Sequence, residues 1–93
     1  MNKDAYKKEA KAELDMLFAK MDKLEAKKMQ AEGETKKKIN EKISALQNQK
    51  NELQSKYDEM ASASEEKWNE VKAAFSSASK SFKEGIGKIS DLF

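Results

Sequence analysis

Cysteine, histidine and proline are all missing from this sequence of 93 residues, and glycine occurs only three times. Without cysteine the chain forms no disulfide and offers no thiol chemistry. Without histidine it also lacks the usual zinc ligand and the commonest acid–base group of enzymes. Because proline is absent and glycine rare, long stretches contain nothing that would interrupt a helix. These absences argue against a metalloenzyme and favour an all-α protein.

Long apolar runs are missing as well. The longest is Met16-Leu17-Phe18-Ala19, whereas a transmembrane helix needs roughly 20 apolar residues. Residues 1–8 contain several lysines and no apolar core of the kind found in a secretory signal. We therefore expect a cytoplasmic protein.

Charge is abundant but balanced, with 19 basic and 17 acidic residues, and every basic residue is lysine. Nucleic-acid-binding proteins more often present a one-sided basic face and use arginine for bidentate contacts. The run Lys36-Lys37-Lys38 is flanked by Glu34 and Glu41, which is typical of a solvated helix turn. We expect no nucleic-acid partner.

Apolar residues in the first third of the chain recur every three or four positions, which is the spacing of one helix face. We predict a helix over residues 3–32. Its apolar seam consists of Tyr6, Ala10, Leu14, Leu17, Met21, Leu24, Lys28 and Ala31. Gly33 follows where this pattern ends, and glycine adopts the left-handed conformation that terminates helices without a steric clash. We predict a turn at Gly33 and, because the connection is short, an antiparallel second helix.

The second helix is predicted to begin near residue 35, and the residues after it allow two architectures. Ser62 and Glu65 form a capping-box pattern and Ser64 is a good N-cap, so a third helix could begin there. That arrangement is a three-helix bundle with a break near 62–64. Alternatively, the apolar seam stays in phase from Ile39 to Ile89 at close to the helical period. We favour the second arrangement, a single 1–93 domain built as an antiparallel helical hairpin or coiled coil. Its long second helix covers residues 35–84, and a weakly ordered tail at 85–93 either frays or docks Ile89, Leu92 and Phe93 onto a neighbour.

The most apolar helix face of the chain lies in residues 64–93. This aromatic stripe consists of Trp68, Val71, Phe75, Ala78, Phe82, Ile86 and Ile89. In the long-helix arrangement it lies beyond the end of the first helix, so that another chain or a lipid surface has to cover it. We therefore predict that the aromatic stripe is the interaction site.

Catalytic chemistry needs convergent acidic, basic or nucleophilic groups in a water-excluding pocket. The sequence shows no such set, no phosphate-binding loop and no metal-ligand spacing. Glu65 and Glu66, the concentrated acidic pair near the stripe, are typical of a helix start. The serines at 76, 77, 79 and 81 are interpreted as solubilising. We expect no enzyme, cofactor or metal.

Two functions remain. The favoured one is a structural or scaffolding protein that forms a homo-oligomer, or pairs with a partner helix, through the aromatic stripe. The alternative is reversible binding of residues 64–93 to a lipid surface. The segment carries five lysines and five acidic residues, whereas binders of anionic lipids usually enrich lysine.

One block of sequence resembles a known group. Residues 61–72, ASASEEKWNEVK, followed by Phe75, are similar to an Ala-Ser-acidic-acidic-x-Trp-x-acidic-aliphatic-Lys segment. That segment occurs in small bacterial proteins described only as coiled-coil proteins. The resemblance is close over residues 61–75. Over the preceding helices it is only generic. It implies helical structure and no known activity.

Overall fold

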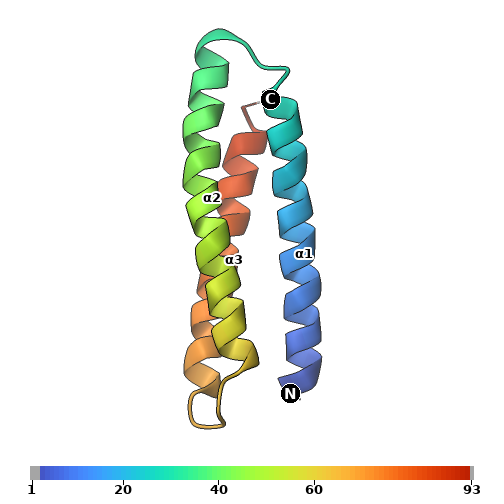
Figure 1. Cartoon of the computed structure of the whole chain (residues 1–93), viewed down its shortest axis with the longest axis vertical. Helices are drawn as coiled ribbons and strands as arrows, with labels where there is room; N and C mark the ends of the chain where they lie inside the picture. The colour runs from blue at the N-terminus through green and yellow to red at the C-terminus, as the bar shows by residue number, and fades with distance from the viewer. Residues whose placement is uncertain (1–2, 93) are drawn as a thin grey trace.

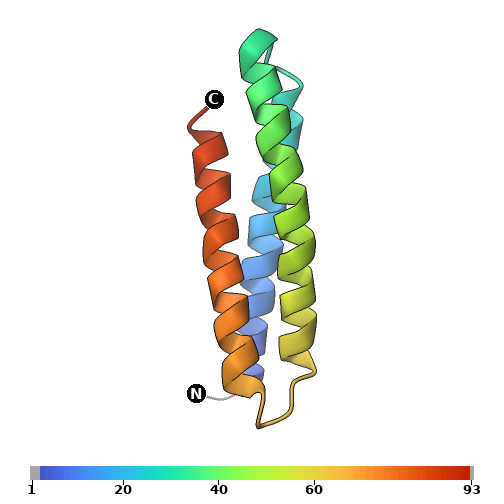
Figure 2. The same ribbon diagram turned by 90° about the vertical axis from the view of Figure 1, so that its left-hand side faces the viewer.

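The computed structural model describes residues 3–92, and within this range the chain forms three α-helices and no strand (Figure 1). Helix α1 spans Lys3–Lys28, α2 spans Gly33–Ala61 and α3 spans Trp68–Ser90. The chain runs up in α1, down in α2 and up again in α3, so α1 and α3 are parallel to each other (Figures 1 and 2). The all-α fold is therefore confirmed in its three-helix form, an elongated bundle about 51 Å long.

The first helix and its turn follow the sequence pattern. The predicted seam of α1 supplies its buried residues, which are Ala10, Leu14, Leu17, Met21 and Leu24. Gly33 has a φ of +65°, a left-handed conformation that residues with a Cβ rarely adopt. Helix α1 ends at Lys28, earlier than the predicted end at 32, and α2 descends from Gly33 as the expected antiparallel neighbour.

The predicted continuous helix over 35–84 is wrong, because the chain leaves the helical path between Ser62 and Lys67. The Ser62 hydroxyl donates to the carbonyl oxygen of Asp58 at 3.0 Å and so caps the end of α2. The N-cap of α3 is Lys67, which makes no side-chain capping bond. Neither the predicted capping box at Ser62 and Glu65 nor an N-cap at Ser64 starts the third helix. The break itself lies where the three-helix alternative put it.

Helix α3 does not weaken at residue 85 as predicted, but continues through both of its glycines to Ser90. A Cβ on Gly85 would lie 2.8 Å from Cδ2 of Leu46, so glycine at this position permits α2 and α3 to approach closely. Ile89 is buried and Leu92 is half-buried against the same core. Phe93, which we expected to dock with them, lies outside the described residues.

Aromatic side chains join α3 to both other helices. The ring centroids of each pair are 5.9 Å apart in edge-to-face geometry, and the pairs are Tyr6–Trp68, Phe18–Phe82 and Tyr57–Phe75. Such pairs add about 0.5–1.5 kcal/mol to the free energy gained from burial alone. The core of the bundle is thus built by all three helices of one chain.

Candidate functional site

The aromatic stripe lies in the core of the bundle. Five of its members are buried, namely Trp68, Phe75, Phe82, Ile86 and Ile89. Val71 and Ala78 are half-buried and pack against the same core. Helices α1 and α2 cover the stripe, so its predicted position beyond the end of the first helix is wrong. Pairing through the stripe and lipid binding by residues 64–93 both assumed an exposed stripe, and the folded bundle does not offer one.

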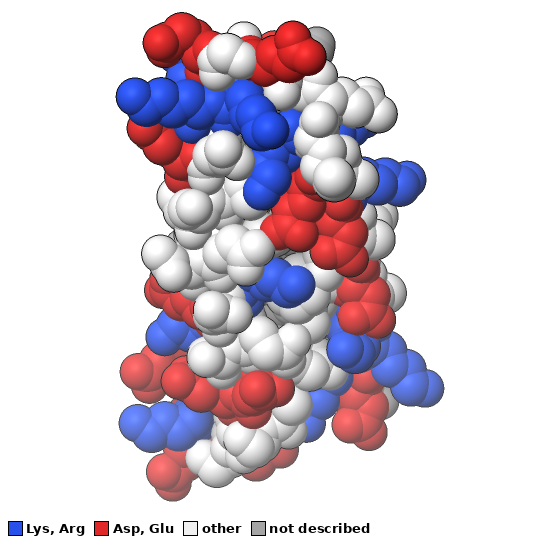
Figure 3. Space-filling model, turned by 45° about the horizontal axis from the view of Figure 1, so that its top comes forward, with Lys and Arg blue, Asp and Glu red and all other residues white. Residues whose placement is uncertain are grey.

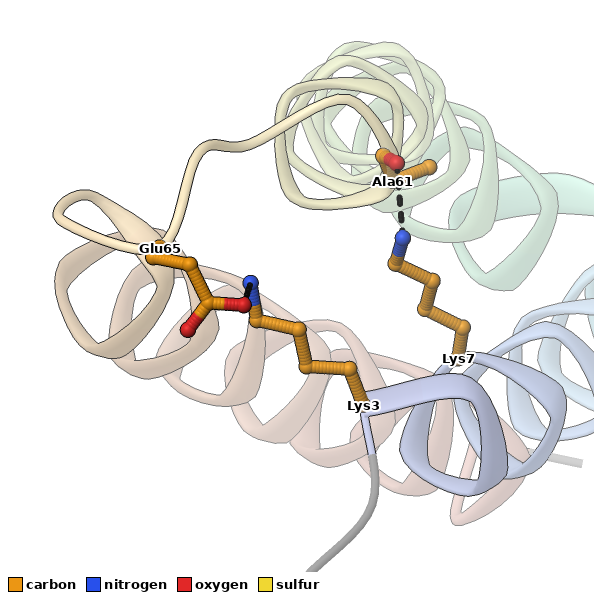
Figure 4. A network of polar contacts seen from close by, with 4 residues as sticks. All are labelled: Lys3, Lys7, Ala61 and Glu65. Carbon is orange, nitrogen blue, oxygen red and sulfur yellow. Dashed lines mark hydrogen bonds and ion pairs between the residues drawn. The ribbon is translucent and has the colours of Figure 1, made fainter.

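Two lysines of α1 hold the turn between α2 and α3 (Figure 4). The Lys3 Nζ lies 2.8 Å from Oε1 of Glu65, and the Lys7 Nζ donates to the carbonyl oxygen of Ala61 at 2.9 Å. The two ammonium groups also lie over the Trp68 ring, 5.3 and 5.9 Å from its centroid. The hydrogen bond from Lys3, together with its charge, lowers the pKa of Glu65. Glu65 therefore fixes the turn against α1 and does not begin a helix.

Polar contacts also connect α1 and α3 farther along the bundle. Ser79 is buried, contrary to its interpretation as a solubilising serine, and its hydroxyl donates to Oε1 of Glu13 at 3.0 Å. Burial raises the pKa of the Tyr6 phenol, and the charges of Glu13 and Glu9 raise it further. Tyr6, Glu13 and Ser79 line one open groove together with Lys80 and Lys83, and the Ser79–Glu13 hydrogen bond joins α3 to α1.

Charge on the bundle surface is mixed. On the side that carries α1 and α2, seen from the Gly33 end, lysine and acidic side chains are interspersed (Figure 3). Among residues 3–92 no group of three or more acidic side chains is placed to hold a metal ion. None of the three helices described is both long and apolar enough to cross a membrane.

A regular pattern of small side chains lies on the outer face of α1. Alanine recurs at seven-residue spacing, and each of Ala5, Ala12, Ala19 and Ala26 is exposed. Residues seven apart on a helix drift by only about 20° around its axis. The alanines therefore form one lane, roughly 31 Å long at 1.5 Å per residue. Met16 lies near the middle of this lane, and 48% of its surface is exposed.

Charged residues flank the alanine lane near both ends. Lys8 and Glu9 lie toward the N-terminus of α1, and Asp22 and Lys23 toward its C-terminus. All four are exposed, and none forms an ion pair with another described residue. Glu9 and Lys23 lie at equal sequence distance from Met16 and carry opposite charge. We define the outer face of α1 as the alanine lane, Met16 and these four charged residues.

This face was not predicted from the sequence. Alanine is common both inside and outside folded proteins, and in α1 the core seam also contains alanine, at Ala10. The signal that could have revealed the face is the seven-residue spacing of the alanines together with an unburied methionine.

Comparison with protein-family models, curated proteins and solved structures finds no match for this chain. Its function therefore has to be argued from the geometry of the chain itself.

Proposed function

We propose that this chain is a non-enzymatic, cytoplasmic structural protein that pairs with a second copy of itself through the outer face of α1. The observation that carries the proposal is the lane of exposed alanines around Met16, with Glu9 and Lys23 of opposite charge seven residues to either side. Met16 and Met29 are the large apolar side chains exposed among the described residues. Because the aromatic stripe is buried, a pairing surface on the folded bundle has to lie elsewhere. The absence of cysteine is compatible with a reducing compartment.

An antiparallel second copy centred on Met16 places Met16 opposite its own equivalent and Glu9 opposite Lys23. In this register Ala5 and Ala26, and likewise Ala12 and Ala19, lie one residue out of alignment, whereas Lys8 and Asp22 lie two residues out of alignment. A parallel copy would instead place each charged residue opposite its own equivalent. Two-fold symmetry makes the antiparallel contact isologous, so that each contact occurs twice.

Apolar contact has to supply most of the free energy of association, because exposed ion pairs contribute only about 0.2–1 kcal/mol each. Small side chains let two helix axes approach toward the lower end of the usual range of about 8–10 Å. Each Met16 can then pack against the alanine lane of the other copy. One helix face is a small interface, so we expect a weak, concentration-dependent dimer.

Sedimentation equilibrium over a wide concentration range tests the pairing. We expect the parent chain to reach the dimer mass at high concentration. Met16→Glu should remain monomeric with unchanged helicity, because it places two like charges at the symmetry axis on an exposed site. Met29→Glu is the matched control, since Met29 is 79% exposed and lies outside the face. A parent chain that stays monomeric at every concentration would refute the proposal.

Charge exchange tests the antiparallel register. Glu9→Lys and Lys23→Glu should each weaken the dimer, by roughly tenfold if two exposed ion pairs turn repulsive. An equimolar mixture of the two variants should regain the parent's association, because each mixed pair again opposes unlike charges. If the mixture associates no better than either variant alone, this register is wrong.

A further inference from the structure

An apolar groove is lined by residues of the C-terminal halves of α1 and α3. These halves lie toward the end of the bundle that carries the turn between α1 and α2 (Figure 1). Its floor is formed by Leu24 of α1 and Ile86 of α3, together with Leu17, which is itself fully buried. The groove is open to solvent along one side and has a volume of about 420 Å³, within the range of roughly 300–1,000 Å³ typical of small-molecule sites. Along α1 it extends from Leu17 to Lys27, a length of about 15 Å at the helical rise.

Gly87 of α3 lines this groove. A Cβ built on Gly87 meets no atom within 4 Å, whereas one built on Gly85 meets Leu46. The two glycines therefore differ in what lies beside them: Gly85 faces the packed α2 side, and Gly87 faces open space. A larger side chain at 87 can enter the groove without displacing the core.

The lining of the groove is basic. Lys20, Lys23 and Lys27 of α1 and Lys83 of α3 line it, and no acidic residue does. A second groove of about 240 Å³, nearer the N-terminus of α1, contains Glu13 beside Lys80 and Lys83. The chain as a whole carries nearly equal numbers of lysines and acids, so the excess of positive charge around the first groove is local.

We infer that this groove binds a single-chain anionic amphiphile of the fatty-acid type. The alkyl chain lies on the leucine and isoleucine floor, where its burial supplies the hydrophobic free energy. The anionic head lies near the ammonium groups of Lys20, Lys23 and Lys83, which can reach it because their aliphatic stems extend along apolar surface. The occupant is a single free molecule, because the groove is a short concave channel between two helices.

This inference goes beyond the proposed self-association. Lys23 belongs both to the groove and to the outer face of α1, so the two proposals are tested at other positions. Lys20 and Lys83 lie outside the outer face of α1 as defined above, so variants at these two positions leave that pairing surface intact. A failure of ligand binding therefore does not bear on dimerisation, and a monomeric chain can still bind the amphiphile.

Isothermal titration of the full chain with dodecanoate, kept below its micelle-forming concentration, measures the binding. We expect one dodecanoate per chain. Dodecyltrimethylammonium, which has the same alkyl chain and the opposite charge, should bind at least tenfold more weakly. Equal binding of the two compounds, or no binding of dodecanoate, would overturn the inference.

Two variants locate the site. Gly87→Leu should fill the groove and reduce dodecanoate affinity at least tenfold without lowering the melting temperature, because leucine is the better helix former. Ala73→Leu adds the same side chain at an exposed position of α3 and should leave the affinity unchanged. Lys20→Gln with Lys83→Gln should weaken dodecanoate binding, whereas the exposed pair Lys36→Gln with Lys37→Gln should not. Unchanged affinity in Gly87→Leu would overturn the assignment to this groove.

Two further titrations distinguish the chemical source of the anion. Inorganic phosphate should bind far more weakly than dodecanoate, because it makes no use of the apolar floor. Phosphatidylglycerol vesicles should not bind the chain detectably, because the groove takes a single chain. Phosphate binding as tight as that of dodecanoate would reduce the site to a simple anion site. Vesicle binding that Gly87→Leu leaves unchanged would point to a membrane surface, and either result would overturn the inference.

Discussion

Helix α3 contacts its two neighbours in different ways. Toward α2 the packing is close and apolar, since Gly85 lies against Leu46 and the rings of Phe75 and Tyr57 meet edge to face. Toward α1 the contact includes the polar pairs Ser79–Glu13 and Lys3–Glu65, as well as the groove lined by Gly87. The α2–α3 side is therefore the more closely packed of the two at these positions, although grooves of about 150 and 310 Å³ also lie along it.

This difference indicates which of the two helix contacts depends on pH. A close apolar contact depends little on pH. A contact that includes an ion pair and a buried hydroxyl bonded to a carboxylate depends more on protonation. Substitutions on the two sides of α3 and titration of Tyr6 test this contrast.

The largest expected losses of stability come from truncating a buried leucine on each side of α3. Leu46→Ala on α2 and Leu24→Ala on α1 each remove a buried side chain, a change that costs about 2–5 kcal/mol of stability. We expect Leu46→Ala to cost more, because Leu46 lies in the close contact with Gly85 and borders a groove of only about 150 Å³, whereas Leu24 borders one of about 420 Å³. Urea unfolding monitored by circular dichroism measures both values. A larger loss for Leu24→Ala would contradict the contrast.

Smaller changes in stability are expected from alanine substitution of the two glycines of α3. Gly87→Ala should stabilise the protein by up to about 1 kcal/mol, because alanine is the better helix former and nothing obstructs its Cβ. Gly85→Ala should lose this gain and destabilise, because its Cβ would lie 2.8 Å from Cδ2 of the buried Leu46 and overpacking costs about 1–3 kcal/mol. The same urea experiment compares the two variants. Equal effects would show that α2 and α3 are not in close contact at Gly85.

The smallest effect concerns pH and the α1–α3 side. Burial, with the charges of Glu13 and Glu9, raises the pKa of the Tyr6 phenol above its ordinary value of 10.0. Its contribution to stability is complete below pH 10 and is lost as the pH rises through the folded-state pKa, because the unfolded chain releases the proton first. Ultraviolet titration in a Tyr57→Phe background should give a Tyr6 pKa above 10.0. Glu13→Gln should lower that pKa only partly, since burial is the larger cause, and a Tyr6 pKa at or below 10.0 would contradict the packing.

Much of the local structure could be predicted because single residues or short patterns determine it. Gly33 marks the first turn, since only a residue without a Cβ adopts its conformation readily. The three- and four-residue spacing around Leu14 and Leu17 identified which face of α1 is buried. The same reasoning selected the aromatic stripe as the most apolar face of α3, and its members are buried or half-buried.

The predicted continuous helix over residues 35–84 is wrong because apolar spacing shows which face of a helix is buried but not which element covers that face. The seam of α2 continues in phase into α3, so the same residues suit one long helix or two helices joined by a turn. The aromatic stripe was predicted to be the interaction site because the long-helix arrangement leaves the stripe uncovered by the first helix. The alanine lane was overlooked because alanine carries little information about burial.

The sequence by itself determined that this chain is helical, where each helix presents its apolar face, and that the chain turns at Gly33. Those features depend on conformational preference and on residue spacing along one helix. Only the tertiary structure decided that the chain turns again at Ser62–Lys67. Folding back lets α1 and α2 of the same chain cover Phe75 and Phe82, which removes them from water without recruiting a second chain.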